Sequence, residues 1–143
     1  MMNKFIKIQE EFILQVLSLL NTIKGKTRLM KFLFLLEKSG RIGVDFSFEP
    51  KHYGPYSKCI DNLLDNLKKK DKISSYYDQN NKTVIYSITD KGYTQIKNNP
   101  LNNRIFTIVE ETIGDLRELN LKELINLVYS RYPEYTFLSK IKK

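Results

Sequence analysis

Apolar side chains near the N-terminus recur every three or four residues, at Phe12, Val16, Leu19, Leu20 and Ile23. This spacing places them on one face of a helix, and Ile13 and Leu17 widen that face. We therefore predict a helix over residues 8–23. Gly25 follows it, and glycine is the residue that best suits the end of a helix.

The next segment is apolar on nearly all sides. Thr27 is placed to cap a helix over residues 28–39, which Gly40 closes. Its large apolar side chains are Leu29, Met30, Phe32, Leu33, Phe34, Leu35 and Leu36. A helix that is apolar all round is normally buried, so we predict that this one forms the centre of the core. Pairing with a second subunit is the alternative use of this surface.

An extended segment follows over residues 41–53. Its apolar side chains alternate with polar ones, at Val44, Phe46 and Phe48, as in a strand or a loop anchored by two aromatic rings. Gly54 then allows a sharp turn, and Pro55 suits the first position of a helix. We predict a third helix over residues 57–69. The side chains expected on its buried face are Ile60, Leu63, Leu64 and Leu67.

Two short segments with strand composition come next. Residues 73–77 and 83–88 are rich in tyrosine and β-branched residues, and the polar residues between them suit a tight turn. We predict a β-hairpin with its tip near residues 79–82. Thr89 is placed to cap a short helix over residues 90–97.

The segment between residues 98 and 103, rich in asparagine, is the best linker candidate in the chain. Two further helices follow it. The apolar face of the first is formed by Ile105, Ile108, Val109, Ile113 and Leu116. Asn120 and Glu123 have the spacing of a capping box that starts the second, which ends before Pro133. Its expected apolar face is Leu121, Leu124, Ile125 and Val128.

These elements predict an α+β fold, mainly helical with a small β-hairpin. Three helices, a hairpin and a further helix, in that order, are typical of a winged helix-turn-helix. Residues 86–92, YSITDKG, resemble the exit from the wing in many winged-helix regulators. We predict a winged-helix domain over residues 1–98 and a helical extension over residues 103–143. The extension either packs on the core or forms a homodimer interface.

Three segments carry a narrower resemblance. Residues 26–36, KTRLMKFLFLL, followed by an aromatic-rich stretch and by residues 52–57, HYGPYS, resemble the Panacea (SocA-antitoxin-like) and YwgA-like proteins. Those share a helix reading K-L-x-K-L-L-(F/Y), then F-x-(F/Y) and (Y/W)-G-P-(Y/V). Residues 128–136, VYSRYPEYT, resemble C-terminal segments of archaeal YwgA-like predicted regulators. Arg28 and Phe32 depart mildly from the helix pattern. The resemblance implies a winged-helix-like fold and a role in regulation or as an antitoxin-type partner of another protein.

Composition excludes several kinds of site. One cysteine, Cys59, allows no internal disulfide, and with one histidine, His52, it supplies neither the usual zinc ligands nor a catalytic triad. We expect His52 to be a structural neighbour of the Gly-Pro turn and Cys59 to be packed. We predict no enzyme and no cofactor. The longest apolar run is far short of the roughly 20 residues that span a membrane, so we expect a cytoplasmic protein.

The charge favours a polyanionic partner. The chain carries 24 Lys and Arg against 16 Asp and Glu, a net charge of +8. Bound lysine and arginine side chains release counterions from phosphates, which drives association with DNA. We therefore predict that double-stranded DNA is the partner. The candidate contacts are Arg28, Lys51, Ser57, Lys58, Asn62, Asn80, Asn81 and Lys82.

The third helix is the element that would read the major groove. Lys58 and Asn62 suit contacts to phosphates or bases. Asp61 and Asp65 oppose this use because phosphates repel carboxylates. The alternative hypothesis is therefore a protein-interaction module, an antitoxin or adaptor that does not read DNA.

Overall fold

The computed structural model describes residues 4–51 and 54–136. Its elements, in chain order, are α1 (Lys4–Leu20), β1 (Thr22–Lys24), α2 (Lys26–Lys38), β2 (Glu49–Lys51), β3 (Gly54–Tyr56), α3 (Lys58–Lys69), β4 (Ile73–Asp78), β5 (Thr83–Ile88), α4 (Asp90–Asn98), α5 (Asn103–Leu116), α6 (Leu121–Arg131) and a 3₁₀ turn, η1 (Pro133–Tyr135). None of the helices in these ranges is long and apolar enough to cross a membrane.

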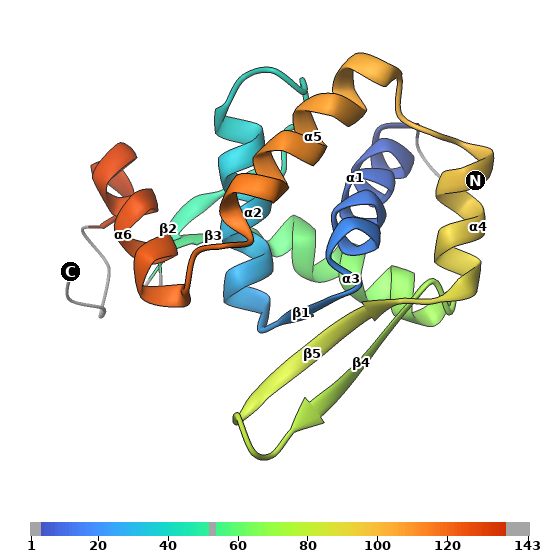
Figure 1. The fold of residues 1–143 in the computed structure, drawn as a ribbon, viewed down its shortest axis with the longest axis horizontal. Helices are drawn as coiled ribbons and strands as arrows, with labels where there is room; N and C mark the ends of the chain where they lie inside the picture. Colours follow the sequence, from blue (N-terminus) through green and yellow to red (C-terminus); the bar gives the residue numbers. More distant parts are fainter. Residues whose placement is uncertain (1–3, 52–53, 137–143) are drawn as a thin grey trace.

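The strands form two small antiparallel sheets. One has the strand order β1-β5-β4, and the other pairs β2 with β3. The β4–β5 register runs from Ile73 opposite Ile88 to Asp78 opposite Thr83, and this hairpin projects from the helices (Figure 1). The predicted hairpin, and the mainly helical α+β class of the fold, are confirmed.

Helix α2 lies at the centre of the molecule. Its residues 29–36 are all buried, as its all-round apolar pattern predicts. Helices α5 and α6 pack against it, and α5 also packs against α1. Side chains of the C-terminal helices, such as Val109 and Val128, belong to the same hydrophobic core as Phe12 and Leu33. Packing on this core accounts for the apolar face predicted for the first helix of the extension.

The predicted end of the first helix is wrong. Helix α1 stops at Leu20, where Asn21 adopts a left-handed φ of 66°. Residues 22–24 form β1 instead and pair with Ser87 through Ile85 of β5. Ile23 is buried, as its place in the apolar pattern requires, but it is buried in a strand. Pairing with β5 overrides the helical periodicity, which is a local signal.

Two predicted helix starts and one predicted buried residue are also wrong. Helix α2 begins at Lys26, with Gly25 rather than Thr27 at its N-cap. Pro55 lies in β3 opposite Pro50, not in the first turn of the third helix. Leu121, expected on a buried face, is 46% exposed at the start of α6. The capping box of Asn120 and Glu123 is present as predicted.

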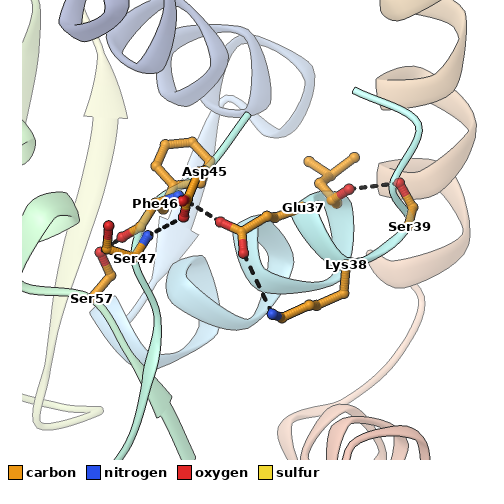
Figure 2. A network of polar contacts seen from close by, with 8 residues as sticks. Glu37, Lys38, Ser39, Asp45, Phe46, Ser47 and Ser57 are labelled. Carbon is orange, nitrogen blue, oxygen red and sulfur yellow. Dashed lines mark hydrogen bonds and ion pairs between the residues drawn. The ribbon is translucent and has the colours of Figure 1, made fainter. Parts of the chain in front are cut away.

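The backbone of Phe46 joins α2 to α3 (Figure 2). Its N–H donates to Glu37 Oε1 at 2.5 Å, and its carbonyl accepts a hydrogen bond from the Ser57 hydroxyl. Ser57 Oγ in turn accepts the Ile60 N–H at 3.0 Å and so caps α3. Glu37, Phe46 and Ser57 together fix the start of α3 relative to the end of α2 across a long connection.

Aromatic rings hold the C-terminal end of the described chain against the same region. Phe34 makes edge-to-face contacts with Phe48, Tyr132 and Tyr135, with ring centroids 4.8 to 5.1 Å apart. Lys38 lies over two of these rings, Phe34 and Tyr135. The extended segment, α2 and η1 therefore share one aromatic cluster.

Gly54 and Tyr129 explain why the Gly-Pro-Tyr turn needs its glycine. Gly54 has a φ of +97°, and a Cβ there would lie 3.2 Å from Cε1 of the Tyr129 ring. Next to this contact Lys31 is fully buried, and burial lowers the pKa of its ammonium group to about 8. The lysine of the α2 motif is thus an interior residue, not a surface charge.

Helix α4 lies unusually close to the base of the hairpin. Thr89 caps it, accepting the Gly92 N–H at 3.2 Å, as predicted. A Cβ on Gly92 would lie only 2.3 Å from the Lys72 carbonyl oxygen. The glycine of the YSITDKG segment therefore permits the hairpin to return onto the helices.

Gly92→Ala is expected to lower the free energy of unfolding by about 2 kcal/mol or more, because backbone must shift to admit the methyl group. Gly114→Ala in α5 is the matched control, since a Cβ there meets nothing within 4 Å. That variant is expected to gain about 0.5–1 kcal/mol from helix propensity. Urea unfolding measures both. Equal effects of the two substitutions would contradict the close contact.

Lys31 predicts a pH dependence of stability. Above about pH 8 it is neutral in the folded state but still charged in the unfolded chain up to its ordinary pKa of 10.5. The unfolded state then binds the extra proton, so the free energy of unfolding rises with pH, by up to about 3 kcal/mol across this window. Lys31→Met is expected to lack the rise. A constant difference between parent and variant in urea unfolding over this window would contradict the buried, lowered pKa.

Candidate nucleic-acid interface

The exposed face of α3 follows from its buried one. Ile60, Leu63, Leu64 and Leu67 face the core as predicted. This leaves Lys58 and Asn62 exposed and one helical turn apart, on one face of the first two turns. Asn66, four residues further on, is exposed and extends the same face. Asn66 is not among the residues predicted to contact DNA, although its spacing of four from Asn62 is the signal that identifies it.

Ser57 does not belong to this face. The prediction that Ser57 contacts DNA requires an exposed side chain, and it is wrong, because Ser57 is fully buried. Its hydroxyl is committed to the Phe46 carbonyl and the Ile60 N–H. The residue before a helix often serves as such a cap. Ser57 positions the face and lies beneath it.

Asp61 was expected to be an exposed acid that repels phosphate, and its surroundings show otherwise. It is half-buried, its Oδ1 lies 2.7 Å from Lys26 Nζ, and the Tyr56 hydroxyl donates to its Oδ2. Burial opposes the charge on Lys26, but the hydrogen bond and charge of Asp61 outweigh it and raise the pKa of Lys26. The negative charge of Asp61 is therefore compensated by the ion pair with Lys26 and the hydrogen bond from Tyr56. Asp65 remains as an exposed acid on α3.

The hairpin tip presents three of the predicted contacts, Asn80, Asn81 and Lys82, all exposed. Asp78 organises this turn. Its carboxylate accepts the N–H groups of Asn80 and Asn81 and the Asn81 side-chain amide at 2.7 Å. These hydrogen bonds, chiefly that of the Asn81 side chain, lower the pKa of Asp78. Asn81 is thus part of the turn, whereas Asn80 and Lys82 present their side chains to solvent.

The other two candidates, Arg28 and Lys51, lie outside α3 and the hairpin tip. Arg28 is half-buried, donates from Nη2 to the Leu119 carbonyl and lies over the Phe32 ring, 5.3 Å from its centroid. It ties α2 to the turn between α5 and α6. Lys51 is exposed in β2, and its Nζ lies 3.4 Å from Glu49 Oε1. Lys51 shares a small groove with Lys26 and Tyr56, near the start of α3.

The candidates for thiol and metal chemistry in the described part of the chain are Cys59 and any cluster of His, Cys, Asp or Glu. Burial raises the pKa of the Cys59 thiol, which is half-buried as expected for a packed cysteine. No group of three or more His, Cys, Asp or Glu within residues 4–51 and 54–136 is placed to hold a metal ion. The prediction for His52 lies outside the described residues.

Two exposed surfaces therefore carry most of the predicted contacts. One is the α3 face, which we define as Lys58, Asn62 and Asn66, and the other is the hairpin tip. Comparison with known proteins gives no further guide, because no family model, characterised protein or solved structure matches the chain. The likeness to Panacea and YwgA-like proteins rests on the short sequence motifs alone.

Proposed function

We propose that this chain is a winged-helix transcription regulator that binds double-stranded DNA through α3 and the β4–β5 hairpin. The order α1-β1-α2-β2-β3-α3-β4-β5 supports this fold: the β2–β3 pair is inserted between α2 and α3, and β1 completes the other sheet beside β5. The observation on which the proposal depends is that Lys58 and Asn62 are both exposed on the same face of α3. In this fold the third helix is the one that enters the major groove.

The dimensions and chemistry of α3 suit that role. Its 12 residues extend over about 18 Å, and the major groove is about 12 Å wide and admits a helix. An asparagine pairs with adenine through two hydrogen bonds, and a lysine at the helix start reaches phosphate or guanine. The ion pair with Lys26 offsets one of the two negative charges on α3 that oppose the approach of DNA. The net charge of +8 adds attraction that does not depend on sequence.

A specific observation favours the second candidate, a protein-interaction module. Tyr76 and Tyr77 are 59% and 57% exposed on β4, and β4 is an edge of its sheet. Exposed sheet edges accept a strand from another chain, and tyrosine is enriched in protein interfaces. The motif resemblance to antitoxin-type proteins points the same way. The double variant Tyr76→Ser with Tyr77→Ser separates the two candidate functions, because it changes the β4 surface and leaves the residues of α3 unchanged. It should weaken binding of a protein partner and leave DNA binding through α3 as in the parent.

Duplex DNA is expected to bind at low salt and to dissociate steeply as salt is added. The slope of log affinity against log salt concentration should be about −0.9 for each phosphate neutralised. Asp65→Asn should tighten binding to every sequence, because the repelled carboxylate is gone. Glu110→Gln, which removes an exposed acid from α5, is the control and should change little. Fluorescence anisotropy with a labelled duplex gives these affinities. The absence of binding at low salt would refute the proposal.

Base reading and phosphate attraction are expected to separate between the helix and the hairpin. Asn62→Ala should reduce preference for the best sequence by about 1–3 kcal/mol. Lys82→Ala should instead weaken all sequences alike and reduce the salt slope by about one. Asn126→Ala and Lys97→Ala, exposed in α6 and α4, are the matched controls. If both test variants bind as the parent does, neither α3 nor the hairpin tip contacts DNA.

A further inference from the structure

A cavity of about 500 Å³ lies on the side of the molecule where β1 and the hairpin meet the C-terminal helices. Its walls come from the end of α1, β1, α2, the turn-proximal end of the hairpin, and the junction of α5 with α6. Small-molecule sites in proteins have volumes of about 300–1,000 Å³. The cavity is therefore large enough for a metabolite-sized ligand, and the DNA surface defined above shares only Asn81 with it.

Three cations line this cavity, Lys24, Arg28 and Arg117. Among the described residues of its lining, none carries a carboxylate. Each arginine spends one donor on a backbone carbonyl, Arg28 on that of Leu119 and Arg117 on that of Leu19. These hydrogen bonds fix the positions of the two guanidinium groups, and each group keeps further N–H donors that a ligand can use. Lys24 is also attracted to the carboxylate of Asp78, whose oxygens accept hydrogen bonds from the amides of the hairpin turn.

Four further residues of the lining are apolar. They are Leu20, Ile23, Phe32 and Leu121, of which Ile23 and Phe32 are themselves buried in the core. Leu121 is 46% exposed although the sequence pattern places it with the buried face of α6. Covering such a side chain is favourable in proportion to the apolar area removed from water. A contact to the phosphate backbone of DNA requires no apolar wall, so this combination distinguishes the cavity from an extension of the DNA surface.

We propose that this cavity binds a small amphipathic anion, a carboxylate or phosphate group carried on an apolar body. The anionic group lies among Lys24, Arg28 and Arg117, and the apolar body covers Leu20 and Leu121. Since residues of β1 and the hairpin form one side and Arg117 and Leu121 the other, the ligand bridges the hairpin and the C-terminal helices. This inference does not rest on DNA binding.

Isothermal titration calorimetry with octanoate tests the proposal on the full chain. Octanoate carries both features of the ligand, whereas octanol lacks the charge and inorganic phosphate lacks the apolar body. We expect saturable binding of octanoate that is at least about tenfold tighter than that of either control. A tenfold change in affinity corresponds to about 1.4 kcal/mol, which is no more than one charge-assisted hydrogen bond contributes. Octyl phosphate is the second arm and shows which anionic group is preferred.

Variants assign the binding to this cavity. Lys24→Gln with Arg117→Gln changes two exposed side chains and is expected to weaken octanoate about tenfold or more. Lys97→Gln with Arg104→Gln removes the same charge elsewhere on the surface and should leave the affinity unchanged. Leu121→Ser should weaken octanoate but not inorganic phosphate. Thermal unfolding of each variant establishes that the fold is retained.

The proposal is overturned if octanoate and octyl phosphate do not bind saturably, if octanol binds as tightly, or if both double variants bind octanoate as the parent does. It is also overturned if Lys24→Gln with Arg117→Gln weakens DNA while the parent binds neither amphipathic anion, because the cations then serve DNA phosphates. Octanoate binding without any DNA binding would support the cavity and refute only the proposed regulator.

Discussion

The placement of α3 depends on a single peptide, that of Phe46. Glu37 holds its N–H from the end of α2, and Ser57 holds its carbonyl from the cap of α3. Gln9 of α1 adds a hydrogen bond to the neighbouring Asp45 carbonyl at 2.7 Å. A buried backbone group left without a partner costs about 1–3 kcal/mol. Side chains from α1, α2 and the cap of α3 provide hydrogen-bond partners for the backbone of residues 45 and 46. The direction of α3 follows from that arrangement.

Once α3 is fixed, its neighbours determine what it presents. Lys26 and Tyr56 compensate the charge of Asp61 on one flank, which leaves Lys58 and Asn62 as the dominant exposed groups of the first turns. The hairpin takes part in two surfaces. Its tip extends the proposed DNA surface, and Asn81 and Thr83 line the cationic cavity beside the C-terminal helices. A ligand in that cavity would touch the same hairpin that we propose contacts DNA.

Local signals in the sequence predicted the hairpin, the Thr89 cap, the capping box and the buried face of α3 correctly, because each depends on residues close together in the chain. The failures depend on distant partners. Residues 22–24 become a strand only because β5 lies beside them. Ser57 is buried by Phe46, and the charge of Asp61 is compensated by Lys26. Periodicity carries no information on such pairs, nor on the cavity that joins Lys24 to Arg117.

The central claim, that α3 and the hairpin tip form a DNA-binding surface, is tested most directly by two-dimensional amide NMR of the labelled chain with a duplex. We expect the largest shift changes on residues 57–66 and 79–82, including the side-chain amide of Asn62. They should fade as salt is raised, because phosphate contacts weaken with ionic strength. Changes confined to α5 and α6, or no changes at low salt, would contradict that claim.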